Sequence, residues 1–132
     1  MTPAEALRRF RARLPARARL YTGGCSGEPL GFVEAFREAP DLAAGLTFVG
    51  QWVPGINHTD WASLHPDASA ETCFLPPALR PSFEDGRTRI LPMAYSHSWD
   101  WLASTPLDGA LMLVSPPDAE GNVSLGVSPD FG

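Results

Sequence analysis

The sequence predicts an α/β domain with a mostly parallel sheet and flanking helices. Segments rich in β-forming residues alternate with segments whose apolar residues recur at spacings of three and four. The apolar run at residues 110–114 contains no charge and is typical of a strand buried on both faces. A length of 132 residues with 44% hydrophobic and 19% charged residues fits one folded domain, residues 1–132, and excludes a disordered chain.

The first predicted element is a basic helix within residues 1–17. Thr2, Pro3 and Glu5 form a capping-box pattern at its start, and Pro15 is expected to end it. An apolar stripe runs along one face: Leu7, Phe10 and Leu14. Six arginines and one acid within the first 19 residues leave two interpretations, a solvated arginine face or a helix that lies against an acidic surface or a polyphosphate.

The remaining elements follow in order. We expect strands at residues 19–22, 46–52, 71–75, 89–91 and 109–115, and helical segments at 28–37, 77–85 and 98–103. Leu30, Val33 and Phe36 should share one face of the second helix. Residues 122–132 alternate apolar and small polar side chains, which indicates an extended ribbon. Because ligands of parallel sheets bind at the carboxyl ends of strands, the loops there are the candidate sites.

One such loop is the run Gly23-Gly24-Cys25-Ser26-Gly27 between a strand and a helix. Three glycines allow close backbone approach to an anion or a developing oxyanion, so the loop could hold either. It could also be only a tight turn. The third alternative is a nucleophile elbow with Cys25 in the central position and a base among His58, His65 and His97.

A second loop contains the pairs His58, Asp60 and His65, Asp67 between strand-forming segments. Their imidazole and carboxylate groups could serve as metal ligands, but a polar loop anchored by Trp52 and Trp61 is the favoured interpretation, and no metal is expected. The cysteines Cys25 and Cys73 have neither zinc-site nor disulfide spacing. With no secretory signal pattern, a cytoplasmic location in a reducing compartment is expected.

Three segments together resemble one known family. They are residues 115–126 (Ser-Pro-Pro-Asp-Ala-Glu-Gly-Asn-Val-Ser-Leu-Gly), residues 23–29 (Gly-Gly-Cys-Ser-Gly-Glu-Pro) and residues 53–57 (Val-Pro-Gly-Ile-Asn). In order and spacing they resemble the N-terminal domain of the acetyl-CoA hydrolase/transferase family, which includes 4-hydroxybutyrate and succinate CoA-transferases. The resemblance implies a fragment of a transferase of acetate metabolism, half of a two-domain enzyme that moves CoA between short carboxylic acids.

The resemblance also implies where the chemistry lies. The family's nucleophilic glutamate belongs to the C-terminal half, so no catalytic residue is expected in this chain, which alone should be inactive. Coenzyme A or acyl-CoA would be the substrate, with no covalently bound cofactor. The implied pocket residues are Gly23, Gly24, Cys25 and Ser26 on one wall and Gly121, Asn122, Ser124 and Gly126 on the other.

Implied partners are small carboxylates, the complementary C-terminal CoA-transferase domain or subunit, and further copies in a homo-oligomer, with no nucleic acid or membrane. Two alternatives stay open. The chain could be a small cysteine hydrolase that uses Cys25 at a strand-turn-helix elbow. It could also be a non-catalytic domain that binds acyl-CoA or a protein. A fragment, a separate subunit and a repurposed domain all fit the sequence.

Overall fold

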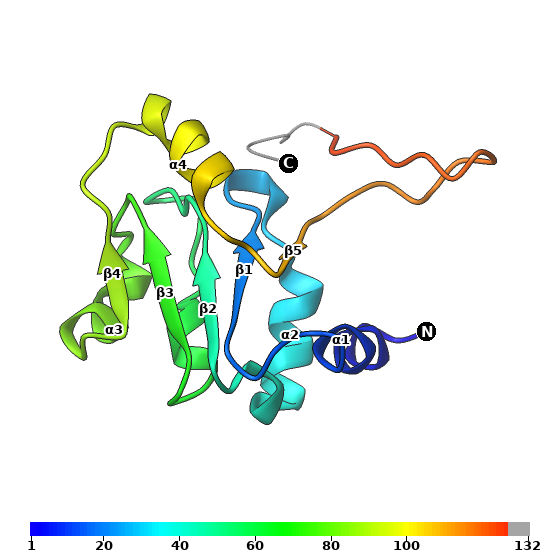
Figure 1. The fold of residues 1–132 in the computed structure, drawn as a ribbon, viewed down its shortest axis with the longest axis horizontal. Helices are drawn as coiled ribbons and strands as arrows, with labels where there is room; N and C mark the ends of the chain where they lie inside the picture. Colours follow the sequence, from blue (N-terminus) through cyan, green and yellow to red (C-terminus); the bar gives the residue numbers. More distant parts are fainter. Residues whose placement is uncertain (127–132) are drawn as a thin grey trace.

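A five-stranded sheet forms the centre of the molecule in the computed structural model, which describes residues 1–126 (Figure 1). The strands are β1 (Ala18–Thr22), β2 (Leu46–Val49), β3 (Ser69–Thr72), β4 (Thr88–Ile90) and β5 (Gly109–Leu111). They lie in the order β4-β3-β2-β1-β5, and all four neighbouring pairs are parallel. The α/β class and the parallel sheet predicted from the sequence are therefore confirmed.

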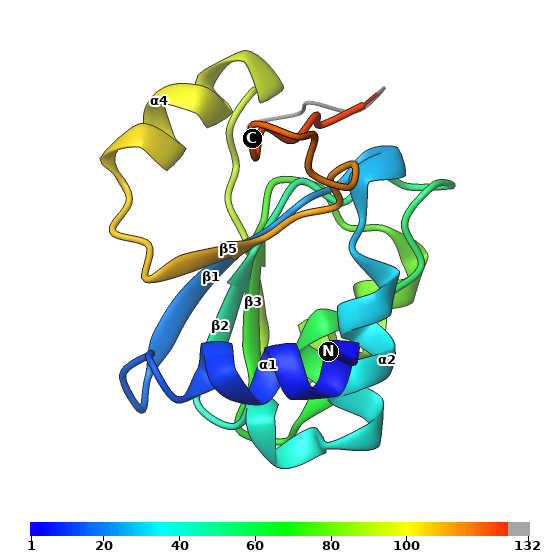
Figure 2. The same cartoon turned by 90° about the vertical axis from the view of Figure 1, so that its right-hand side faces the viewer.

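Helices cover both faces of this sheet. The helices are α1 (Pro3–Arg11), α2 (Leu30–Glu38), α3 (Arg80–Glu84) and α4 (Ser98–Ser104), and 3-10 turns lie between them at η1 (Cys25–Gly27), η2 (Pro40–Ala43), η3 (Trp61–Leu64), η4 (Pro77–Leu79) and η5 (Tyr95–His97). Helices α1 and α2 pack on one face, and α4 lies over the other (Figure 2). The larger core fills the first face around Leu20, Phe36 and Phe48. A smaller cluster of Tyr21, Val49 and Leu102 lies under α4.

The order in which strands are added to the sheet reverses between β4 and β5. From β1 to β4 each strand is added beside the previous one, whereas β5 returns to the far side of β1, pairing Leu20 with Gly109 and Thr22 with Leu111. The segments that leave β1 and β5 therefore diverge from adjacent strand ends. In doubly wound sheets this topological switch point is where a crevice opens.

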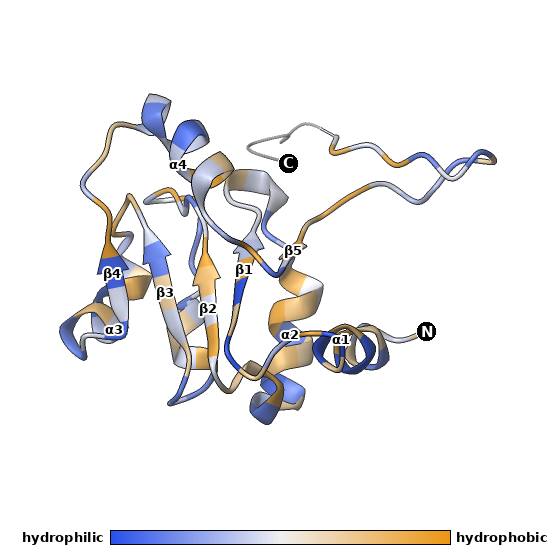
Figure 3. Cartoon of the chain, viewed as in Figure 1, coloured by the Kyte–Doolittle hydropathy of each residue, from blue (hydrophilic) through white to orange (hydrophobic). Residues whose placement is uncertain are grey.

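Helix α1 begins as its capping box predicts but ends earlier than expected. Thr2 Oγ1 accepts from the Glu5 backbone N–H at 3.2 Å, and the Glu5 carboxylate accepts from the Thr2 N–H at 2.8 Å. The helix ends at Arg11, so the helical part of residues 1–17 is shorter than predicted. The Arg11 guanidinium donates to the carbonyls of Pro15 and Ala16, both at 2.9 Å, and so stabilises the turn that follows. Figure 3 shows hydrophilic residues along α1.

Two predicted features differ in the region after the last strand. The strand expected at residues 109–115 stops at Leu111, because β1 ends at Thr22 and offers no partner beyond it. Residues 112–126, here called the arm, instead extend away from the sheet (Figure 1). Its two runs meet where Ser115 N–H donates to the Ser124 carbonyl at 2.8 Å. The rest of the predicted 122–132 ribbon lies outside the described residues.

Leu30 does not share the buried face of α2 with Val33 and Phe36, because it occupies the first helical position and is 57% exposed. Within residues 1–126, no helix combines the length and apolar composition that a membrane crossing requires.

Candidate functional site at the switch between β1 and β5

The loop after β1, residues 23–27, is here called the Cys25 turn. Its start is tied to the neighbouring strand, because Gly23 N–H donates to the Leu111 carbonyl at 3.1 Å. A Cβ on Gly23 would lie 2.7 Å from the Gly27 carbonyl oxygen, so only glycine fits this close approach. Gly27 N–H closes the turn on the Gly24 carbonyl at 2.9 Å. The turn is therefore a compact, internally bonded unit.

Cys25 at its centre has a backbone φ of +49°, in the left-handed region that non-glycine residues rarely adopt. Asn57 holds this conformation from a loop 32 residues away. The Asn57 carboxamide accepts from Cys25 N–H at 3.1 Å and donates to the Cys25 carbonyl at 3.0 Å. Its oxygen also accepts from Val53 N–H at 2.8 Å, so the segments 23–29 and 53–57 form one structural unit.

Glu28 in turn holds the Asn57 side chain in place. Glu28 is only 9% exposed, and its carboxylate accepts from Asn57 Nδ2 at 3.1 Å and from the Trp61 indole N–H at 3.2 Å. Trp61 in turn stacks on Trp52, with ring centroids 6.2 Å apart. Buried carboxylates need such donors to offset lost hydration. The network links the predicted anchoring tryptophans to the Cys25 turn through Glu28 and Asn57.

A groove of about 430 Å³ lies between the Cys25 turn and the arm, and is here called the switch groove. It is lined by Ser26 and Gly27 on one side and, on the other, by Leu113, Val114, Ser115, Ser124, Leu125 and Gly126. Of the eight residues predicted for the pocket, Ser26, Ser124 and Gly126 are thus brought together at this groove. Gly23, Gly24 and Cys25 build the turn that positions Ser26.

Gly121 and Asn122 lie at the tip of the arm and form its turn. Asp118 Oδ1 accepts from the backbone N–H groups of Glu120 and Asn122, both at 2.9 Å, and Gly121 has a φ of +86°. The Asn122 backbone N–H is the main group that holds the pKa of the Asp118 carboxyl below its usual range, and the Asn122 side chain adds to it. These residues give the tip its shape.

Sequence reasoning missed the apolar lining of the switch groove. Leu113 and Val114 looked like core residues of a buried strand, yet they are exposed and face the groove beyond the end of β5. The apolar run itself was the signal in the sequence that could have revealed this lining. Where an apolar run continues beyond the end of the neighbouring strand, its last side chains have no strand beside them and stay exposed.

The anion-cradle alternative loses most of its donors in this geometry. The N–H groups of Gly23, Cys25 and Gly27 all donate within the protein, which leaves those of Gly24 and Ser26 to a ligand. Helix α2 begins only at Leu30, after the intervening 3-10 turn. The turn therefore differs from loops that present a helix N-terminus directly to phosphate.

The histidines and acids of the second loop are dispersed. His58 is exposed beside Asn57, and His65 Nδ1 accepts from the Asp67 N–H at 3.0 Å. Asp60 accepts from Ser63 and Ser82 hydroxyls at 2.8 and 2.7 Å. Among residues 1–126 no three His, Cys, Asp or Glu side chains gather closely enough to hold a metal ion, and Cys25 and Cys73 form no disulfide.

This geometry defines a doubly wound α/β domain with a groove at its switch point, and solved structures share that fold. The crystal structure of RipA from Yersinia pestis matches with a TM-score of 0.74 at 22% sequence identity, covering 99% of this chain and 32% of that chain. Two RipA variants match with TM-scores of 0.76 and 0.75 at 22% and 23% identity. This chain thus spans about a third of the length of the RipA chains. At this identity the likeness shows the fold alone.

The comparisons correct the family expectation. No family model and no curated protein matches the chain, and the solved structures described above carry the name RipA. Membership in the acetyl-CoA hydrolase/transferase family, and with it CoA transfer in acetate metabolism, is therefore withdrawn as an assignment. The three motifs behind it are rich in Gly, Pro, Ser and Asn, and the structure accounts for much of their composition through the Cys25 turn, the Asn57 contacts and the arm tip.

Proposed function

We propose that this domain binds acyl thioesters, with acyl-CoA as the ligand to test, in the switch groove. The observation that carries the proposal is the position of the groove. It lies between the segments that leave β1 and β5, which are adjacent parallel strands at the topological switch. Open α/β sheets bind ligands in the crevice at that point. A volume of about 430 Å³ is within the range of small-molecule sites.

The lining of the groove suits the acyl and pantetheine part of such a ligand. Leu113, Val114 and Leu125 offer apolar contact to methylene groups. The hydroxyls of Ser26, Ser115 and Ser124 can donate to a thioester or amide carbonyl. None of the eight lining side chains is charged, so the phosphates of CoA would extend outside the groove.

We further propose that a complementary domain or subunit closes the open side of the groove and contributes to a site for a small carboxylate. Exposed apolar side chains on the arm support this: Leu113, Val114 and Val123. Exposed apolar patches of this kind are typical of surfaces that associate, and self-association into a homo-oligomer would cover them as well. The greater length of the RipA chains is consistent with a domain that works beside further structure.

A second candidate function is a thiol hydrolase with Cys25 as nucleophile. The strained φ of Cys25 favours it, because backbone strain of this kind clusters at functional sites. The Cys25 thiolate would add to the thioester carbonyl and expel the CoA thiolate, which takes a proton to become free CoA. Water would then cleave the acyl-cysteine to a carboxylic acid and the regenerated thiol. His58, which follows Asn57, would be the candidate base.

One experiment tests both. Butyryl-CoA is titrated into the purified chain by calorimetry, while chromatography follows free CoA and intact mass follows acylation. We expect saturable binding that is lost in Ser26→Trp, which fills the groove from an exposed position, and kept in Ala12→Trp, an exposed control position directly after the end of α1. Equal binding by both variants, or none by the native chain, would refute the binding proposal. CoA release that disappears in Cys25→Ser would establish the hydrolase instead.

A further inference from the structure

A second hollow borders the switch groove and is here called the α1 hollow. It has a volume of about 270 Å³ and lies between the starts of α1 and α2 and the base of the arm. Its lining includes Pro3, Ala6, Pro29, Gly31, Phe32 and Leu113. Leu113 also lines the switch groove, so the two hollows meet at this side chain. A ligand seated in the groove can therefore extend past Leu113 into the α1 hollow.

The two hollows differ in their chemistry. Three serines line the switch groove, whereas Thr2 is the one hydroxyl-bearing residue among the described residues that line the α1 hollow. The Thr2 hydroxyl already accepts from the Glu5 N–H in the capping box. None of the lining side chains is charged, and Pro3 and Pro29 have no N–H to donate. The α1 hollow therefore suits a hydrocarbon chain better than a polar group, which would lose hydration there.

Backbone hydrogen bonds fix the walls of the α1 hollow. In α1, the Ala6 N–H donates to the Thr2 carbonyl at 3.0 Å. At the start of α2, the Phe32 N–H donates to the Pro29 carbonyl at 2.9 Å, and the Phe32 side chain packs against the larger core. Leu113, at the border with the switch groove, is 55% exposed. An alkyl chain that covers Leu113 would remove apolar surface from water, which favours binding.

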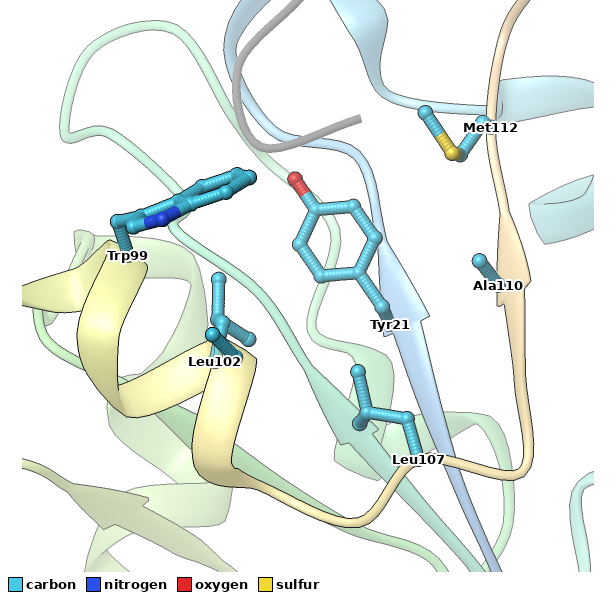
Figure 4. A pocket seen from close by; sticks show the side chains of 7 residues that line it. Tyr21, Trp99, Leu102, Leu107, Ala110 and Met112 are labelled. Atoms are coloured by element: carbon cyan, nitrogen blue, oxygen red, sulfur yellow. The ribbon is translucent and has the colours of Figure 1, made fainter.

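Another apolar cavity, of about 320 Å³, lies on the α4 face of the sheet and is here called the α4 cavity. Figure 4 labels six of its lining residues: Tyr21, Trp99, Leu102, Leu107, Ala110 and Met112. No residue that lines the α4 cavity also lines the switch groove. Continuity through Leu113 therefore favours the α1 hollow as the extension of the groove.

We infer that the α1 hollow takes the distal carbons of a straight acyl chain, so that the domain prefers thioesters of medium-length acyl groups, of about eight carbons, over short ones. This inference rests on the proposed function, because it places the thioester group at the serines of the switch groove. A cavity of about 150 Å³ holds the six carbons of benzene. The α1 hollow, at about 270 Å³, has room for about four methylene groups beyond a butyryl chain.

The probes are butyryl-CoA and octanoyl-CoA, each titrated into the purified chain by calorimetry. Full burial of one methylene group strengthens binding about fourfold, and partial burial in a hollow open to solvent about twofold. Over four methylene groups, octanoyl-CoA should therefore bind roughly tenfold to twentyfold tighter than butyryl-CoA. Gly31→Trp should bring this ratio close to one, because a Cβ on Gly31 meets no atom within 4 Å and the indole can fill the hollow. Ala6→Trp, which fills the hollow from α1, should have the same effect.

Two matched tryptophan controls make the result specific. Ala12→Trp, at an exposed position outside both hollows, and Ala110→Trp, at an exposed position in the α4 cavity, should keep the ratio of the native chain. Equal affinity of the native chain for the two thioesters overturns this inference and leaves the proposed function standing, whereas absence of binding by both refutes both. A ratio that survives in both Gly31→Trp and Ala6→Trp, or that is lost in Ala110→Trp, also overturns the inference.

Discussion

Truncation of Asn57 to alanine tests the unit formed by the Cys25 turn and the second loop. The Asn57 side chain is 1% exposed and makes four hydrogen bonds, to Cys25 N–H, the Cys25 carbonyl, Val53 N–H and Glu28. At a net contribution of about 1 kcal/mol each, their loss lowers the free energy of unfolding by about 4 kcal/mol. That is a large fraction of the roughly 5–15 kcal/mol typical of a domain.

The measurement is equilibrium urea denaturation followed by tryptophan fluorescence, since Trp52 and Trp61 lie against this unit. Asn122→Ala is the matched control, because that asparagine lies exposed at the arm tip, and we expect a change below about 0.5 kcal/mol. A loss below about 1 kcal/mol for Asn57→Ala would refute the reasoning, since the four partners would then have found other bonds at little cost.

Three further predictions concern other elements. Gly45→Ala should destabilise the fold by roughly 2 kcal/mol or more, because the backbone φ of Gly45 is +72° and the new Cβ would lie 2.5 Å from a backbone carbonyl oxygen. Gly55→Ala is the control for the same urea denaturation assay. Its φ is +84° but the space around it is open, so it should lower the free energy of unfolding by less. Thr2→Ala should cost about 1 kcal/mol, seen as faster amide exchange in α1. Asn122→Ala should raise the pKa of the Asp118 carboxyl, measured by carbon NMR titration. Because folding lowers this pKa, the stabilisation of the arm tip is present at pH values above the pKa of Asp118 in the unfolded chain. It is lost as the pH falls through the pKa of Asp118 in the folded chain.

The sheet and the start of α1 were predictable because their determinants are local. Short runs of β-forming residues gave the strands, and the capping box at Thr2 and Glu5 needs only a spacing of three residues. The Cys25 turn was predictable as a loop for the same reason. Its support by Asn57 was not, because a side-chain amide that binds backbone atoms 32 residues away leaves no periodic signal.

The arm shows a second limit of local reasoning. The apolar run through Val114 has the composition of a buried strand, but burial also requires neighbours in space. Parallel pairing with β1 ends at Leu111, opposite Thr22, because the chain turns away at Gly23. Residues 23–27 thus set the length of a strand that lies nearly ninety residues further along the chain.

The late position of β5 has a consequence for how the protein assembles. Strands β1 to β4 can pair in chain order, each with the strand before it, but one edge of β1 stays open until β5, the last of the five strands along the chain, docks against it. Contacts of such long sequence separation form slowly, and an open strand edge favours aggregation in the meantime. Because Gly23 bonds to Leu111, the Cys25 turn gains its last anchor only when β5 docks. Formation of the switch groove and protection of the β1 edge should therefore appear in the same folding step.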